Sequence, residues 1–266
     1  MSRVLFLILF AFLCNTLWAQ EQNLDLKETR LLADYQRASI PLDQLKICND
    51  ILYFYKDERK DFYKAKQYGL HAETLINKGL ESPLVSSAYR GIGWIYLNDG
   101  EMSSAYSYFS KSLEYADKIE DEVEYGKSLQ ALGELYTQIR NYYLAEKLLY
   151  QGLVKSFIKN DTAELGNAYV KLALLNHKQR KFAMAGYFFG RSISYFEKTH
   201  LKAMVILETN NVGYMFAEQK MYKKAREWYE KAYHLAEKFN MKGEAGYVHG
   251  NIGQMFKLEK RYDTAY

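Results

Sequence analysis

The sequence predicts an all-α fold, an α-solenoid built from antiparallel helical hairpins. Alanine recurs every forty residues along the 266-residue chain, at Ala65, Ala105, Ala145, Ala185, Ala225 and Ala265. A second column of small residues keeps the same step, at Gly93, Gly133, Ala173, Gly213 and Gly253. The only two prolines are Pro41 and Pro83, so long helices are permitted throughout the repeated segments. A chain with one fixed period of this kind folds as a stack of similar units.

Each repeat is expected to be one helical hairpin. In the repeat around Gly93, apolar residues from Ile92 to Tyr96 share a first helix, which Asn98-Asp99-Gly100 ends. The second helix starts near Ser103 or Ser104. Corresponding turns are predicted at Arg140-Asn141, Arg180-Lys181, Lys220-Met221 and Lys260-Arg261.

The small columns are interpreted as the points where the two helices of a hairpin cross. A distance between helix axes at the low end of about 8 to 10 Å requires Gly or Ala at the contact. Gly133 and Ala145 form one predicted pair, with Tyr136, Tyr142 and Leu149 filling the space around it. The structural repeat positions are therefore Gly93, Ala105, Gly133, Ala145, Ala173, Ala185, Gly213, Ala225, Gly253 and Ala265.

These columns resemble the tetratricopeptide repeat, whose consensus joins Leu-Gly, a Tyr, an Ala and an aromatic residue. Leu132, Gly133, Tyr136, Ala145 and Leu149 follow that pattern, and the resemblance covers residues 44–266. The usual period is about 34 residues. The longer period resembles the class found in kinesin light chains and in bacterial receptors for signalling peptides. The resemblance implies a right-handed superhelix whose first helices line a concave face.

The period divides the chain into eight predicted segments: a signal peptide 1–19, a leader with a capping helix 20–43, a degenerate repeat 44–83, repeats 84–123, 124–163, 164–203 and 204–243, and a truncated repeat 244–266. The repeat 44–83 is degenerate because Tyr53 replaces the small residue and Lys56 replaces the aromatic one. The sequence stops one residue after Ala265, inside a predicted second helix. A terminal repeat needs a polar outer face, so the sequence is expected to be a fragment.

The N-terminus is predicted to be a secretory signal peptide. Arg3 precedes an apolar run from Val4 to Leu13, and the predicted cleavage follows Ala19. This run is too short to span a bilayer. An uncleaved N-terminal anchor is the alternative. The protein is therefore expected to be exported, to the periplasm or cell envelope. Cys48 is then the only cysteine of the mature chain, which excludes an internal disulfide and favours a buried small hydrophobe.

The charge balance does not indicate a nucleic-acid partner. Removal of the leader takes away only Arg3, so the formal net charge falls from +4 to +3. Basic and acidic residues alternate along the chain, as on a solvated helical face. Contact with a membrane is expected only through a segment beyond Tyr266.

No catalytic residue, metal site or cofactor is predicted. The five histidines lack the i, i+4 spacing of a helical zinc site: His71, His177, His200, His234 and His249. A phosphate-binding loop is not indicated, because the clustered glycines fall within predicted helices: Gly91, Gly93, Gly246, Gly250 and Gly253. An enzyme would need catalytic groups that converge from several repeats, and this remains an alternative without a candidate set.

The resemblance implies that a protein or an extended peptide binds along the first helices. The predicted groove residues are Arg90, Trp94, Leu97, Lys127, Gln130, Glu134, Asn167, Lys171, Leu174, His177, Asn210, Asn211, Tyr214, Tyr247, Asn251, Gln254 and Lys257. Asn211 and Asn251 occupy the position from which related arrays clamp a peptide backbone. The alternative is that both only solvate the helix. A binding array of this kind is either a free scaffold or the sensory region of a longer histidine kinase or transcriptional regulator.

Overall fold

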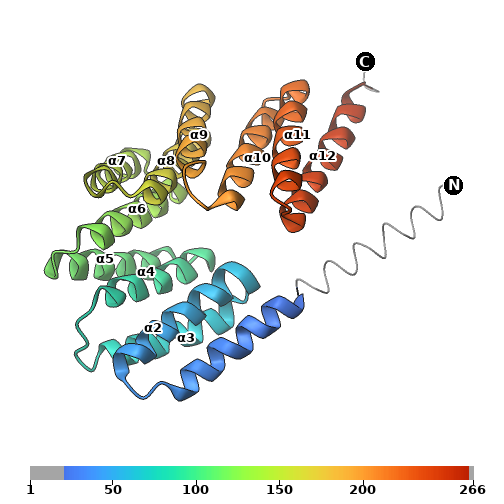
Figure 1. Cartoon of the computed structure of the whole chain (residues 1–266). Helices are drawn as coiled ribbons and strands as arrows, with labels where there is room; N and C mark the ends of the chain where they lie inside the picture. Colours follow the sequence, from blue (N-terminus) through green and yellow to red (C-terminus); the bar gives the residue numbers. More distant parts are fainter. Residues whose placement is uncertain (1–20, 264–266) are drawn as a thin grey trace. The chain divides into compact units, whose positions relative to one another are not determined.

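The computed structural model describes residues 21–263, whose regular secondary structure is entirely helical (Figure 1). A first helix covers residues 21–37. The following elements are α2 (Pro41–Tyr53), η1 (Phe54–Arg59), α3 (Phe62–Ile76), α4 (Pro83–Asn98), α5 (Met102–Lys118), α6 (Glu122–Gln138), α7 (Tyr142–Lys159), α8 (Thr162–Lys178), α9 (Phe182–Phe196), α10 (Lys202–Glu218), α11 (Tyr222–Lys238) and α12 (Lys242–Asp263). The predicted all-α architecture of sequential hairpins is confirmed. The predicted leader 1–19 and Ala265 lie outside the described residues.

The forty-residue period consists of two halves of equal length. Residues with a left-handed backbone follow successive helices at steps of twenty: Gly100, Glu120, Arg140, Asn160 and Arg180, and then Lys220 and Asn240. Each marks the turn at which the chain reverses direction. The turns predicted at Arg140, Arg180 and Lys220 are therefore present, and α5 begins at Met102, one residue before the earlier of its two predicted starts.

Side-chain caps fix where several helices begin. The Asp161 carboxylate accepts hydrogen bonds from the backbone N–H groups of Ala163 and Glu164, at 3.0 and 3.1 Å. Asp121 caps the start of α6 in the same way. An N-terminal cap of this kind satisfies backbone donors that have no partner within the helix.

The small columns lie where the two helices of a hairpin come close, except at the predicted position Gly253, which is exposed and where an added Cβ would meet no atom within 4 Å. A Cβ added to Gly133 would lie 2.7 Å from the Leu149 side chain and 3.3 Å from the Ala145 carbonyl oxygen. The same addition at Gly213 would lie 2.6 Å from the Tyr229 ring. Ala145 is fully buried, and Tyr136 and Tyr142 pack against the surrounding core. A larger residue in either column would therefore separate the helices.

Two features differ from the expected pattern. The first hairpin contains a π-helix, η1, directly after Tyr53 and before a left-handed Lys60. The predicted turn at Lys260-Arg261 is wrong, because α12 continues through both residues to Asp263. Lys and Arg favour helix intrinsically, and a turn between them needs a packed second helix to hold it.

The described residues form two compact units, which divide within α6 between Ala131 and Leu132. In the first unit, Leu31, Leu32 and Tyr35 of the N-terminal helix pack on the core of α2 and α4. The Arg59 guanidinium binds three acids of the same helix, Glu21, Asp25 and Glu28. In the second unit, the aromatic rings of α8 and α9 dominate the core: Tyr169, Phe188, Phe189 and Phe196.

Candidate binding surface

In the second unit, three first helices share one exposed face. Helices α8, α10 and α12 each contribute three residues at i, i+4 and i+7, which lie on the same side of a helix. We call this the first-helix face, and its residues are Asn167, Lys171 and Leu174 of α8, Leu207, Asn211 and Tyr214 of α10, and Tyr247, Asn251 and Gln254 of α12. Leu174, Leu207, Tyr214 and Tyr247 are all exposed, and Tyr247 is 58% accessible. Leu207 is the member that the sequence analysis missed, although it stands forty residues after Asn167.

Several predicted groove residues lie below the surface instead. Gln130 is 2% exposed, Asn210 is 1% exposed and Leu97 is 2% exposed. Arg90 is also buried. Whether a side chain of one helix is buried depends on how the neighbouring helix packs against it. The spacing of residues along the sequence does not reveal that packing. These four buried side chains therefore do not line a binding surface in this structure.

In the first unit, the two predicted basic residues bind the same carboxylate. The Arg90 guanidinium binds the Glu124 carboxylate, which is itself buried. The Lys127 ammonium lies 3.2 Å from the other oxygen of Glu124. Trp94 is half-buried, with its ring 5.1 Å from that of Phe109 in an edge-on contact. These residues join α4 to the start of α6 and to α5.

Contacts between polar side chains also link the first helices of the second unit. The Lys171 ammonium lies 2.5 Å from Glu134 of α6. His177 Nε2 of α8 lies 2.8 Å from Glu218 of α10, and the Tyr214 hydroxyl donates to the same carboxylate at 2.8 Å. The predicted residues Glu134 and Lys171 are thus paired between α6 and α8, while His177 of α8 and Tyr214 of α10 both contact the Glu218 carboxylate. Glu218 is a partner that the sequence analysis did not single out.

The two asparagines of the clamp hypothesis each donate a hydrogen bond within the unit. Asn211 Nδ2 donates to Glu208 at 3.1 Å, and Asn251 Nδ2 donates to Asn210 Oδ1 at 2.8 Å. Asn167 Nδ2 donates similarly to Glu164 at 3.2 Å. Gln254 and Lys257 are exposed on α12. Asn211 and Asn251 are half-buried, whereas the residues that accept their hydrogen bonds, Glu208 and Asn210, are buried.

Glu208 is the functional candidate that the sequence analysis missed. Its side chain is 1% exposed. Burial raises the pKa of this carboxyl to about 7, although the Asn211 hydrogen bond and the charge of Lys171 act in the opposite direction. A signal was present in the sequence, because the residues at the same repeat position are small: Ala88, Ser128, Ala168 and Val248.

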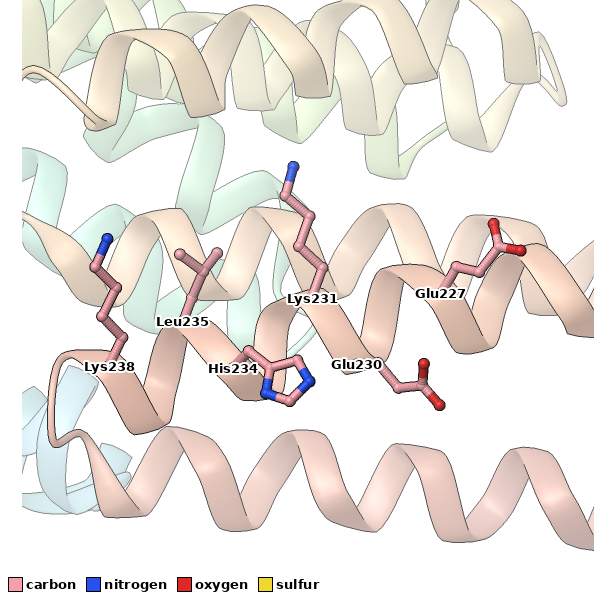
Figure 2. Close-up of a pocket in the computed structure, with 6 residues that line it drawn as sticks. All are labelled: Glu227, Glu230, Lys231, His234, Leu235 and Lys238. Carbon is pink, nitrogen blue, oxygen red and sulfur yellow. The ribbon is translucent and has the colours of Figure 1, made fainter.

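A surface depression on α11 does not bring together side chains from several helices. Figure 2 shows its lining residues, which all come from the single helix α11: Glu227, Glu230, Lys231, His234, Leu235 and Lys238. Within residues 21–263, no three His, Cys, Asp or Glu side chains are grouped as a metal site requires. None of the helices that the structure describes is long and apolar enough to cross a bilayer.

Comparison with solved structures shows the fold. This structure is similar to a Podosopora anserina kinesin light chain with TPR-like repeats, at TM-score 0.54 and 12% identity over 77% of this chain and 100% of that one. The fold is a tetratricopeptide-repeat array. The array is also similar to a Rap protein complexed with competence and sporulation factor, at TM-score 0.68 and 14% identity over 87% of this chain and 72% of that one.

A third similar structure contains a bound peptide. It is the Rap conjugation gene regulator of the plasmid pLS20 in complex with the Phr* peptide, at TM-score 0.63 and 15% identity over 80% of the array and 62% of that protein. No protein-family model and no curated protein matches the sequence. At these identities the likeness concerns the fold of the array.

Proposed function

We propose that the first-helix face of the second unit binds an extended peptide or a peptide-like segment of a partner protein, without catalysis. The arrangement of the face carries this proposal. Its middle row contains Lys171, Asn211 and Asn251, and exposed apolar side chains flank that row on both sides. Amide groups can bond both the N–H and the C=O groups of a backbone, while Tyr214 and Tyr247 supply anchoring area for apolar side chains.

The comparisons support a peptide as the ligand class. The pLS20 Rap regulator was solved with a peptide bound, and it has the same kind of helical array. Tyrosine is well suited to such a surface, because its ring provides apolar contact area and its hydroxyl provides a polar end. We therefore place the partner's backbone along the middle row and its side chains against the tyrosines.

Selection from a library of random peptides, displayed on phage and applied to the full chain, tests this function. Selected peptides should bind wild type and lose about tenfold or more in affinity when Tyr214→Ala and Tyr247→Ala are combined. The matched control combines Tyr143→Ala and Tyr187→Ala, two tyrosines of α7 and α9 that are 78% and 58% exposed. The control should bind as wild type does. Failure to select any peptide, or equal loss in both double variants, would refute the proposal.

We further propose that the protein acts after export, in the bacterial envelope. The apolar run from Val4 to Leu13 and the predicted cleavage after Ala19 support this location. Expression of the full sequence and of a form without residues 1–19, followed by cell fractionation and N-terminal sequencing, tests it. Export with a new N-terminus at Gln20 is the expected result. Recovery of both forms in the cytoplasm would contradict it.

A further inference from the structure

Two buried polar side chains of α10 hold the two asparagines of the first-helix face. Glu208 and Asn210 are each 1% exposed. The Glu208 carboxylate accepts the bond from Asn211 Nδ2, and Asn210 Oδ1 accepts the bond from Asn251 Nδ2. One of these bonds lies within α10 and the other joins α10 to α12. Glu208 and Asn210 therefore bind Asn211 and Asn251 of the middle row from the buried side of the face.

The carboxyl of Glu208 is not needed to pack the helices. The other repeats place Ala88, Ser128, Ala168 and Val248 at this position, so a small apolar or hydroxyl side chain suffices there. A buried carboxylate costs free energy unless hydrogen bonds and opposite charge compensate it. Asn211 and Lys171 supply part of that compensation in this structure, and the remaining cost is the reason that the pKa of the carboxyl is raised. What the carboxyl adds to the array is a fixed acceptor under Asn211.

We propose that Glu208 and Asn210 are positioning residues that orient Asn211 and Asn251 so that both present their amide oxygens to the N–H donors of a bound peptide backbone. Asn211 Nδ2 donates to the Glu208 carboxylate in this structure, and a carboxylate in its ionised form can only accept hydrogen bonds. The Asn211 oxygen is then the acceptor offered to a ligand. Asn251 is oriented in the same sense because Asn210 Oδ1 takes its nitrogen. This inference rests on the proposed function. It adds the polarity of recognition, by which we mean that Asn211 and Asn251 bind the N–H donors of the peptide backbone and not its C=O acceptors.

The orientation of Asn211 can be tested without any ligand, by NMR of the full chain. In wild type, the side-chain amide protons of Asn211 should show nuclear Overhauser effects to Glu208 and slow exchange with solvent. Glu208→Met should remove both signatures. Glu208→Gln should keep them, because the glutamine carbonyl still accepts. The positioning role is overturned if wild type shows an averaged, rapidly exchanging amide or if Glu208→Met leaves the signals unchanged.

The polarity of recognition is tested with a peptide selected on wild type and then N-methylated at one backbone position at a time. We expect two positions at which N-methylation weakens binding about tenfold, because each removes a bonded N–H donor. The same two modifications should change affinity by less than about twofold in the combined Asn211→Ala and Asn251→Ala variant. Equal sensitivity in wild type and in that variant would overturn the proposal.

The variants of Glu208 separate positioning from general stability. Glu208→Met should weaken the selected peptide about tenfold while leaving the chain as stable as wild type or more so, and Glu208→Gln should restore affinity. If affinity follows thermal stability across the variants, the role is structural and the inference is wrong. If no peptide can be selected although the Asn211 amide is ordered, the proposed function and the recognition of N–H donors both fail, while the positioning of Asn211 stands.

Discussion

The hairpins α2/α3 and α10/α11 have residues of opposite size at the same two repeat positions, and these residues contact different helices. In α10/α11 the first helix supplies Gly213 and the second supplies Tyr229, whose ring would lie 2.6 Å from a Cβ on the glycine. In α2/α3 the sizes are exchanged, with Tyr53 on the first helix and Gly69 on the second. A Cβ on Gly69 would lie 2.8 Å from Ile92 of α4 and 3.2 Å from Leu52 of α2, while the Tyr53 ring lies 3.4 Å from a Cβ placed on Gly91 of α4. The exchanged residues of the first hairpin therefore pack against α4 of the next hairpin, whereas Gly213 and Tyr229 pack against each other within their own hairpin.

The two hairpins also differ at one buried position that carries an ionisable group in each. Cys48 of α2 and Glu208 of α10 stand four repeats apart in the same column, and both are buried. Burial raises the pKa of Cys48 to about 11 and that of Glu208 to about 7. Cys48 is thus a neutral hydrophobe at physiological pH, whereas Glu208 titrates within the physiological range. Cys48 therefore serves packing alone, whereas the ionisable Glu208 is available for a functional role.

The largest expected effect comes from removing the charge of Glu208. The pKa of this carboxyl is about 7 in the folded chain, whereas that of an unperturbed glutamate is 4.5. The folded chain binds the proton more tightly, so the group destabilises it progressively as pH rises from about 4.5 to about 7, with no further change above. Glu208→Gln should therefore stabilise the chain by about 3 kcal/mol at pH 8 and by less than about 1 kcal/mol at pH 5.

Urea unfolding of wild type and variant at both pH values measures this difference. Glu230→Gln, at an exposed position on α11, is the matched control and should change stability by less than about 0.5 kcal/mol at either pH. A gain from Glu208→Gln that is the same at pH 5 and pH 8 would show that the carboxyl does not titrate in this range.

The next largest effect tests whether the alanine column sets the distance between the helices in both hairpins. Ala65 and Ala225 occupy the alanine column in α3 and α11, and both are fully buried. Ala65→Leu and Ala225→Leu should each destabilise the chain by about 1 to 3 kcal/mol through overpacking. Ala183→Leu, at an exposed position of α9, is the control and should change stability by less than about 0.5 kcal/mol.

Thermal unfolding measures all three alanine variants. If Ala225→Leu is costly and Ala65→Leu is tolerated, the exchange of Tyr53 and Gly69 has moved the crossing of the first hairpin away from Ala65. If both are tolerated, the alanine column does not set the distance between the helices. Equal costs would show that the first hairpin keeps the same crossing despite its exchanged residues.

The periodic part of the fold could be predicted from the sequence, and the local departures could not. The hairpins and the turns at Arg140, Arg180 and Lys220 follow from columns that repeat many times. The π-helix η1 depends on a local shift of backbone hydrogen bonding, for which the spacing of side chains gives no signal. A turn at Lys260 was predicted from the period alone, and α12 runs through it.

The candidate site could be predicted only as a helix face. The sequence placed Asn211 and Asn251 on the first helices, but it could not reveal which amide atom each uses or that Asn210 is buried beneath them. The bond between Asn251 and Asn210 joins two helices across about one repeat of sequence, and the burial of Asn210 depends on how neighbouring helices pack. Glu208 could have been found as the charged member of a small column, although its hydrogen bond to Asn211 required the structure.

The smallest expected effect concerns the turn that follows the first helix of each hairpin. Lys60 and Lys220 both adopt the left-handed conformation there, with φ of 56° and 59°. Glycine adopts this conformation without the steric cost that a Cβ imposes, so Lys60→Gly and Lys220→Gly should each stabilise the chain by about 0.5 kcal/mol. The reverse change, Gly100→Ala in the α4/α5 turn where φ is 79°, should cost about 1 kcal/mol. Thermal unfolding midpoints measure these shifts. A gain at Lys220 without one at Lys60 would mean that η1, which ends immediately before Lys60, holds that turn by contacts that glycine weakens.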